Sequence, residues 1–155
     1  MSIRAATPAD LAEVIASAAA LFAEDGGTRD PHTDTTWPEK HGHDHYGTAI
    51  TDPDALCLLA ESGDRVVGHL IGRLKAPNPT RPLVVGAVLE SVRVAEDQRG
   101  SGVASALHDA FAAWARRNGV TEVTVHAYTS NTAAIAFYQA RGYEPMSLQL
   151  RLSVD

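Results

Sequence analysis

A glycine-rich turn lies between a strand-like run and a helix-like run in the stretch VRVAEDQRGSGVASAL, residues 92–107. Gly100 and Gly102 have no Cβ, so an anion can approach the backbone closely at both positions. The N–H groups up to Ser105 open the expected helix and have no partners within it. The helix dipole favours an anion at that point, and Arg99 adds a full positive charge. The turn is therefore predicted to bind a phosphate or a diphosphate.

Two familiar nucleotide sites do not fit this turn. A P-loop needs a Lys directly after its last glycine to reach the β- and γ-phosphates, and no Lys follows Gly100 or Gly102. A dinucleotide-binding turn needs a third glycine and follows its strand immediately. Here Ser105 takes the place of that glycine, and residues 95–99 separate the strand from the turn. Two interpretations remain: the turn binds the diphosphate of another carrier, or it is a plain N-terminal turn with flexible glycines.

Hydrophobic periodicity and turn residues predict the elements that position the turn. Strand-like runs cover residues 3–5, 55–60, 65–74, 83–94, 122–127 and 147–154. Helix-like runs cover residues 8–26, ended by the Gly26-Gly27 pair, 36–50, 101–118 and 130–141. The order β-α-α-β-β-β-α-β-α-β puts three consecutive strands before a crossover helix, which requires a mixed sheet. We expect an α/β (α+β) fold in a single domain over residues 1–155.

The overall composition excludes several classes of protein. Hydrophobic residues make up 45% and charged residues 21% of the chain, as in ordinary globular domains. No apolar run approaches the roughly 20 residues that span a bilayer, and the first residues lack the apolar core of a signal peptide. The sequence therefore predicts a cytoplasmic protein with no membrane partner. The net charge is −6 and no basic face is visible, which argues against nucleic acid as a partner.

Acidic side chains are concentrated in one segment. Residues 24–54 carry eight of them against only Arg29 and Lys40. An acidic surface there would suit a cationic small-molecule partner, and a solvated surface kept for solubility explains it equally well. The single Cys57 cannot form an internal disulfide and is expected to be buried.

Three segments together resemble one enzyme superfamily. The run QRGSGVASAL resembles the acyl-CoA signature Arg/Gln-x-x-Gly-x-Gly/Ala of the GCN5-related N-acetyltransferases (GNAT), with Arg99, Gly102 and Ala104 at its fixed positions. The run NTAAIAFYQARGYEP (131–145) resembles the later motif of that superfamily, which has an Asn, an aromatic-Tyr pair and Gly-Tyr/Phe. LESVRV (89–94) resembles the strand before the signature, which often carries Glu.

The resemblance implies acetyl-CoA as the acyl donor, no metal, and a sheet splayed between two parallel strands to admit the pantetheine arm. A bulge in strand 83–94 would open that gap. The N–H near Val92 could also face the thioester carbonyl. Residues implied for the CoA pyrophosphate are Arg99, Gly100, Ser101, Gly102, Val103, Ala104 and Ser105. Residues implied for the pantetheine channel are the backbone of Val92, Arg93 and Val94, and the side chains of Asn131, Ala133, Ala134 and Tyr138.

Acetyl transfer to an amine needs a base and an acid. A primary amine with a pKa near ~10 is mostly protonated at neutral pH, so a base must remove its proton. Glu90 is the first candidate and His126 the second; a structural ion pair for Glu90 and a histidine satisfied within the sheet are the alternatives. Tyr138 occupies the position where the superfamily commonly places the acid, and core packing is its alternative. Asn131 could be a helix cap only.

The run HGHDHYG raises the question of a metal site, because His41, His43 and His45 follow His32 closely. On a helix, His41 and His45 share one face and His43 points away, and no third ligand stands in a defined register. We therefore predict no metal. His45, Trp37 and Tyr46 would instead line the acceptor pocket, with aromatic walls for a cation. His126 is predicted on the substrate side as well. An ordinary amphipathic surface helix is the alternative.

These observations together predict an acetyl-CoA-dependent N-acetyltransferase that acts on a small cationic amine: a polyamine, an aminoglycoside-like compound or an amino-acid derivative. Acetylation of a protein N-terminus or lysine is an alternative. A non-catalytic acyl-CoA sensor is another, and the pairing of Glu90 with Tyr138 speaks against it. Dimers are common in the superfamily, so a homodimer stays open.

Overall fold

The computed structural model describes residues 1–154. In chain order the elements are β1 (Ser2–Ala5), the 3-10 turn η1 (Pro8–Asp10), α1 (Leu11–Leu21), the π-helical turn η2 (Phe22–Gly26), α2 (Gly27–Arg29), α3 (Trp37–Thr51), β2 (Ala55–Ser62), β3 (Arg65–Leu74), β4 (Gly86–Val94), the 3-10 turn η3 (Glu96–Gln98), α4 (Val103–Arg117), β5 (Glu122–Val125) and α5 (Thr132–Ala140). The predicted α/β class is confirmed, and the predicted order holds as far as α5. None of the described helices is both long and apolar enough to cross a membrane.

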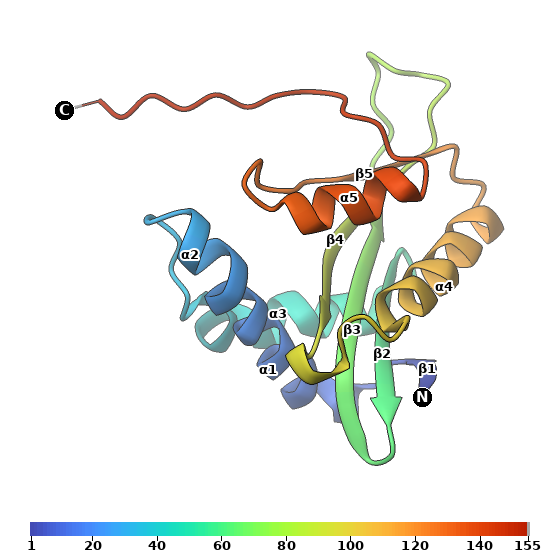
Figure 1. Ribbon diagram of the computed structural model, residues 1–155. Helices are drawn as coiled ribbons and strands as arrows, with labels where there is room; N and C mark the ends of the chain where they lie inside the picture. Colours follow the sequence, from blue (N-terminus) through green and yellow to red (C-terminus); the bar gives the residue numbers. More distant parts are fainter. Residues whose placement is uncertain (155) are drawn as a thin grey trace.

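The strands form one five-stranded sheet in the order β1-β2-β3-β4-β5 (Figure 1). The pairs from β1 to β4 are antiparallel, and β4 and β5 are parallel. Two parallel neighbours need a crossover connection, and α4 provides it. The glycine turn before α4 therefore stands beyond the carboxyl end of β4, where the two parallel strands can separate.

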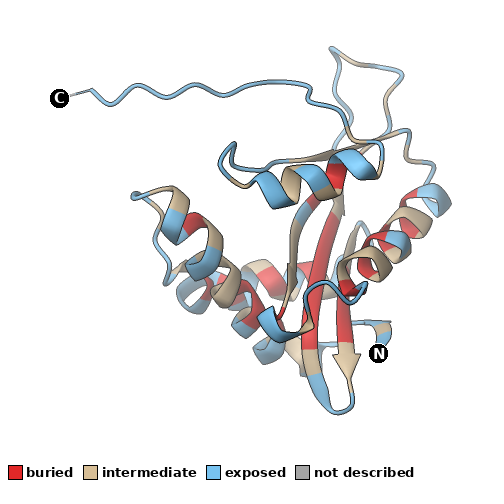
Figure 2. Cartoon of the chain, in the orientation of Figure 1, coloured by how far each residue is buried: buried red, intermediate tan, exposed pale blue. Residues whose placement is uncertain are grey.

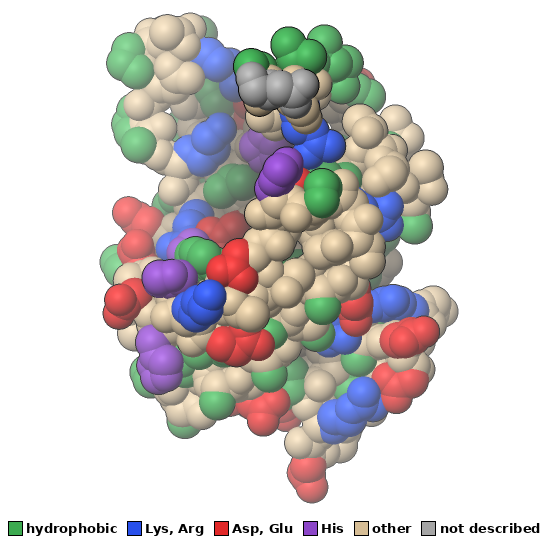
Figure 3. All heavy atoms as spheres, turned by 90° about the vertical axis from the view of Figure 1, so that its left-hand side faces the viewer, with side chains coloured by type: hydrophobic (Ala, Val, Ile, Leu, Met, Phe, Trp, Pro, Cys, Tyr) green, Lys and Arg blue, Asp and Glu red, His purple; other side chains and the backbone are tan. Residues whose placement is uncertain are grey.

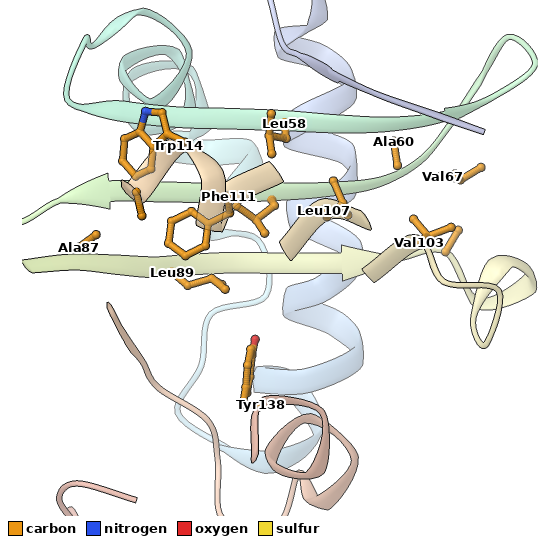
Figure 4. Packing of buried hydrophobic residues seen from close by; sticks show 13 residues of the cluster. Leu58, Ala60, Val67, Ala87, Leu89, Val103, Leu107, Phe111, Trp114 and Tyr138 are labelled. Carbon is orange, nitrogen blue, oxygen red and sulfur yellow. The ribbon is translucent and has the colours of Figure 1, made fainter. Parts of the chain in front are cut away.

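Buried side chains lie on both faces of the sheet (Figure 2). One cluster packs under α4 and includes Leu89, Leu107 and Phe111 (Figure 4). The other packs between the sheet and the helices α1 and α3, and it includes Val14 and Cys57. The predicted burial of Cys57 is confirmed. Each face is thus covered by helices, and β3 and β4 run through the middle of the protein.

The first helical region differs from the prediction at its end. The Gly26-Gly27 pair does not stop the helix, which continues through η2 and α2 to Arg29. Both glycines have helical φ values (−57° and −64°). Their missing side chains admit the following loop instead, since a Cβ on Gly27 would lie 2.7 Å from Cγ2 of Thr35. A π-helical turn widens the helix locally and is frequent at functional sites.

The strand predicted over 83–94 begins at Gly86 and contains the expected bulge. Ser91 pairs with Ile71 and Leu89 pairs with Gly72, so Glu90 is an extra residue opposite β3. On its other side, β4 pairs with β5 only as far as Leu89. The bulge and the end of the parallel ladder coincide, and the sheet opens at Glu90.

The closing strand predicted over residues 147–154 is wrong for this chain as described. Residues 143–154 form neither helix nor strand and run out from the body as an extended segment (Figure 1). They are exposed over most of that length (Figure 2). A strand needs a neighbour for its N–H and C=O groups, and none of the five described strands lies beside this segment.

Candidate active site

The turn before α4 has the open shape that an anion requires. Gly100 and Gly102 have φ values of 77° and 88°, which favour glycine. A Cβ built on either one would meet nothing within 4 Å, so the space above the turn is empty of protein atoms. The first α-helical hydrogen bond of α4 runs from the N–H of Ala106 to Gly102 O (3.0 Å). The N–H groups of Val103, Ala104 and Ser105 precede that bond and lie at the helix N-terminus. The turn therefore fits a diphosphate.

The open edge of β4 presents alternate backbone groups. The N–H of Ala95 donates to Val67 O on β3 (2.8 Å), which makes this pair a hydrogen-bonded one. Such pairs alternate along an antiparallel ladder. The backbone N–H and C=O of Arg93 therefore also point toward β3, while those of Val92 and Val94 point into the gap. An extended amide-containing ligand could therefore bond the backbone of Val92 and Val94 but not that of Arg93.

The carboxylate of Glu24, in η2, forms ion pairs with Arg93 and Arg99, the two arginines beside the turn. Glu24 accepts hydrogen bonds from Nη2 of Arg93 (2.7 Å) and from Nη2 of Arg99 (2.8 Å). The bond from Arg93 contributes most to holding the pKa of Glu24 below its ordinary value. Arg99 also donates through Nε to Val94 O (2.9 Å). Arg99 thus lies beside the glycine turn, as predicted, and its partner there is Glu24.

The next residue, Asp25, reaches the opposite wall of the gap. Its Oδ1 accepts from Nε of Arg29 (2.6 Å) and from Nδ2 of Asn131 (3.2 Å). Arg29 in turn donates through Nη1 to the Ser130 hydroxyl (3.0 Å). We call Glu24 and Asp25 the acidic bridge, because one binds β4 and the turn while the other binds the start of α5.

The bulged residue Glu90 is held from two sides. Nε of Arg73 donates to its Oε1 (2.7 Å), and Nε2 of His45 lies 3.0 Å from its Oε2. An ionised carboxylate only accepts hydrogen bonds, so Nε2 of His45 must carry the proton and Nδ1 of a neutral ring keeps its lone pair. Glu90 is therefore both the predicted candidate base and the structural ion pair that was its alternative.

Aromatic rings surround His45. Trp37 lies edge-on to His45 (ring centroids 5.2 Å apart) and to Tyr46 (6.3 Å), and it stacks on Phe22 (5.9 Å). Burial raises the pKa of Tyr46 to about 12. The structure thus brings together Trp37, His45 and Tyr46, three of the predicted acceptor-side residues, and adds Phe22, which no sequence motif marked.

Tyr138 lies on the opposite side of the gap from β3. Its ring belongs to the core cluster under α4, and its hydroxyl points from α5 toward β4 (Figure 4). Burial raises its pKa to about 12. The ring packs against Phe137 and Tyr143 with centroids 5.4 and 5.3 Å away. Tyr138 is therefore a core aromatic whose polar end faces the gap.

The other predicted residues take more peripheral places. Asn131 caps α5, since its Oδ1 accepts from the N–H of Ala134 (3.1 Å), and it also bonds the acidic bridge. Ala134 packs against the core, whereas Ala133 is exposed. His126 is exposed just beyond β5, and within residues 1–154 its side chain forms no hydrogen bond or ion pair with Glu90 or Tyr138.

Several acidic side chains of residues 24–54 are paired with basic side chains in the folded protein, so this segment is less negative than its sequence suggests. Four of its carboxylates are neutralised by cations, and acidic and basic side chains alternate on this face rather than forming one acidic patch (Figure 3). The pairs are Glu24 with Arg93 and Arg99, Asp25 with Arg29, Asp30 with Arg151, and Asp34 with Lys40. Within residues 1–154, no three His, Cys, Asp or Glu side chains gather so that they could hold a metal ion.

A buried histidine that the sequence did not single out supports the bulge from below. Nδ1 of His69 lies 2.5 Å from the Ser17 hydroxyl, and Nε2 lies 2.7 Å from the Ser91 hydroxyl. Burial lowers the pKa of His69 to about 4, so the ring is neutral. It joins α1 to the residue after Glu90. The one sequence feature that could have indicated this role is the position of His69, a polar residue, within the apolar run of β3.

Comparisons with known proteins agree with this geometry. The chain matches the Acetyltransferase (GNAT) family over residues 19–143. A mycothiol acetyltransferase of Geodermatophilus obscurus is 33% identical over 86 residues, which are 56% of this chain and 28% of that enzyme. The chain thus spans well under a third of that relative's length.

Solved structures share the fold at lower identity. A GCN5-related N-acetyltransferase of Ralstonia eutropha superposes with a TM-score of 0.77 at 18% identity, covering 98% of this chain and 97% of that one. An aminoglycoside antibiotic 6'-N-acetyltransferase of Acinetobacter haemolyticus gives 0.71 at 22% identity over 100% and 99%. The family match covers most of the chain, and the protein belongs to the GNAT family of acetyltransferases.

Proposed function

We propose that this N-acetyltransferase moves an acetyl group from acetyl-CoA to the primary amine of a small cationic acceptor by direct attack. The observation that carries the proposal is the bulge at Glu90. There the sheet opens, and the carboxylate of Glu90 with the ring of His45 lies on one side of the opening. The hydroxyl of Tyr138 points toward it from the other side.

The donor side fits acyl-CoA through backbone groups. The turn at Gly100 and Gly102 would hold the pyrophosphate, with Arg99 beside it, and the open edge at Val92 and Val94 would hold the pantetheine arm. Bound acetyl-CoA supplies the activated acetyl thioester. The N–H near Val92 would stabilise negative charge on a carbonyl oxygen at this edge.

Glu90 and His45 would receive the proton of the acceptor amine. The Glu90 carboxylate orients the His45 ring and fixes the proton on Nε2, which leaves Nδ1 as the accepting atom. Arg73 holds the other carboxylate oxygen and so fixes the geometry of the pair. Proton removal by a positioned group of this kind is worth about 10²–10⁴ in rate.

Tyr138 would supply a proton or a hydrogen bond to the departing sulfur. Its raised pKa keeps the phenol protonated at every pH below about 12, so the donor is present throughout the working range. The burial of the ring in the core fixes its direction.

The acceptor side favours a small cation. Trp37 and Phe22 are partly exposed aromatic rings; Trp37 lies beside His45, the partner of Glu90, and Phe22 stacks on Trp37, a combination that attracts an ammonium group. Tyr46 is only 3% exposed and supports Trp37 from the core. The names of the relatives, an aminoglycoside acetyltransferase and a mycothiol acetyltransferase, support small-molecule acceptors.

The test is thiol release from acetyl-CoA across a panel of polyamines, amino sugars, amino-acid derivatives and lysine peptides. We expect turnover with at least one small cationic amine and little with the peptides. Turnover confined to peptides would replace the small-molecule acceptor by a protein. Acetyl-CoA binding without thiol release from any amine would support a sensor.

Two histidine variants test whether His45 itself, and not just any histidine of α3, is needed for proton removal. His45→Gln should lower kcat by about 100-fold, because it removes the proposed proton acceptor. His43→Gln is the matched control, because His43 is exposed on the same helix and makes none of these contacts. Equal losses in the two variants would refute the role of His45.

A further inference from the structure

We propose that the hydroxyl of Ser91 donates a hydrogen bond to an oxygen of the acceptor, on the carbon next to the one that bears the amine. The acceptor is then a vicinal amino alcohol or an α-amino carbonyl compound. A polyamine does not fit, because its nitrogens are protonated at neutral pH and offer no atom that accepts a hydrogen bond. The inference rests on the proposed function, since it concerns the acceptor whose amine meets Glu90 and His45.

Ser91 lies on the acceptor side of the sheet, directly after the bulge. It pairs with Ile71 of β3, and residues directly opposite each other in a sheet point to the same face. Ile71 belongs to the buried cluster between the sheet and the helices α1 and α3. On that same face His45 of α3 reaches Glu90. The Ser91 side chain is half-buried, so part of it is open to a ligand beside Glu90.

The charged neighbours of Ser91 along β4 already have partners. The carboxylate of Glu90 is held from β3 and from α3. Two residues beyond Ser91, Arg93 donates to Glu24 through Nε (3.1 Å) and through Nη2 (2.7 Å). The charges on both sides of Ser91 are thus paired within the protein. A neutral oxygen therefore suits this position better than a second charged group of the acceptor.

The ring of His69 determines in which direction the Ser91 hydroxyl donates. His69 is 0% exposed, and its two nitrogens face the hydroxyls of Ser17 and Ser91. Burial lowers the pKa of His69 to about 4, so the ring is neutral, with one donating and one accepting nitrogen. One serine must therefore donate to the ring and the other must accept from it.

The position of Ser17 decides between these two arrangements. Ser17 is 8% exposed, and within residues 1–154 its hydroxyl has no hydrogen-bond partner other than Nδ1 of His69. If that nitrogen carried the ring proton, the proton of the Ser17 hydroxyl would be buried without an acceptor, which is costly. Ser17 therefore donates to Nδ1, and Nε2 of His69 carries the ring proton and donates to Oγ of Ser91.

This direction leaves the proton of the Ser91 hydroxyl available to a ligand. The oxygen already accepts from His69, so the hydroxyl proton must point to a different atom. Within residues 1–154 no other hydrogen-bond partner lies at this hydroxyl. Because Ser91 adjoins Glu90, where the acceptor amine is proposed to lose its proton, an oxygen next to that amine is the group that fits. His69 is thus a positioning residue that does not itself touch the acceptor.

Nuclear magnetic resonance of the histidine rings tests the bond directions without any substrate. The chemical shifts of the two nitrogens in a neutral imidazole show which one carries the proton. We expect Nε2 of His69 to carry it at neutral pH, and the His69→Gln spectrum assigns its signals among the seven histidines. A ring protonated on Nδ1 would overturn the proposal, because Ser91 would then donate to His69.

Matched pairs of amines test the bond to the acceptor. One pair is ethanolamine with propylamine, and the other is phenylalaninamide with phenethylamine. Only the first member of each pair has the oxygen. The two members also differ in amine pKa, so the measured quantity is the ratio of their kcat/KM values in wild type and in Ser91→Ala. We expect Ser91→Ala to lower this ratio about tenfold, the effect of one hydrogen bond.

Ser17 variants test the positioning role of His69. Ser17→Ala removes the group that directs the ring, so it should also lower the ratio, and Ser17→Thr should restore it because it keeps the hydroxyl. A purely structural role would lower kcat for both members of a pair alike. Ser62→Ala is the matched control, because Ser62 ends β2 and makes none of these contacts.

Three kinetic results would overturn the inference. An unchanged ratio in Ser91→Ala would show that the hydroxyl does not bind the acceptor. An equal loss for both members of each pair would assign the hydroxyl to the thioester of the donor. Turnover of putrescine without turnover of either oxygen-bearing amine would exclude the class of acceptor and leave the proposed function in place. Absence of thiol release with every amine would instead overturn the proposed function, and this inference with it.

Discussion

The proposed donor side of the site is built from backbone groups, whereas the proposed acceptor side is built from side chains. On the donor side, the turn at Gly100–Gly102 and the edge of β4 present N–H and C=O groups whose directions follow from local conformation. On the acceptor side, Trp37 and His45 of α3 meet Glu90 of β4 only because the fold brings two distant segments together. A site made of backbone groups suits a donor that is always the same. A site made of side chains can change by substitution to suit a different acceptor.

Replacing Tyr138 by Phe should produce the largest effect and should sharpen this contrast. In the proposed mechanism the hydroxyl serves the leaving group, which is the same for every acceptor, so kcat should fall by about 100-fold for all amines alike. The affinity for CoA should be unchanged, because the ring still packs against Phe137 and Tyr143. Thiol release measured with two unrelated amines checks this. A loss that depends on the amine would move Tyr138 to the acceptor side, and unchanged turnover would exclude it as the acid.

The same contrast decides what the sequence could predict. The turn was predicted from Gly100 and Gly102, because left-handed glycines before a helix specify a local shape. The bulge in β4 was also predicted, because the run over residues 83–94 is long and the resemblance implies a gap beside it. The partners Arg73 and Glu24 were missed, since nothing local marks an arginine on β3 or a glutamate in a helix as the neighbour of a residue far along the chain.

The closing strand shows a different limit. Its alternating pattern was interpreted as a closing strand, whereas residues 143–154 form neither helix nor strand. Periodicity reports which face of a segment is apolar but not whether a neighbouring strand lies beside it. The prediction for the Gly26-Gly27 pair was wrong for a similar reason. The two glycines were interpreted as the end of the helix, but the helix continues, and Gly27 is small because Thr35 packs against it.

A Gly102→Ala variant should have a smaller effect than Tyr138→Phe, confined to the donor side. A φ of 88° is strained for any residue with a Cβ, at about 1–2 kcal/mol. Relaxation of the turn would misdirect the N–H groups and raise the Kd for CoA about tenfold, with the KM for the amine unchanged. Gly119→Ala is the matched control, because Gly119 has a φ of 69° at the other end of α4. If both variants weakened CoA binding equally, the effect would be one of stability.

Removing the charge of Glu24 should have the smallest effect, and in the opposite direction. The Glu24 carboxylate occupies Arg93 and Arg99, the cations next to the predicted pyrophosphate site, so it competes with a bound diphosphate. Glu24→Gln keeps the size of the side chain but weakens that competition, and exposed ion pairs of this kind are worth about 0.2–1 kcal/mol. The Kd for CoA should therefore fall about two- to fivefold, measured by calorimetry at low salt. Glu61→Gln, which loses the pair with the remote Arg4, should leave the Kd unchanged. A rise in Kd for Glu24→Gln would mean that the acidic bridge holds the arginines in place for the donor instead of competing with it.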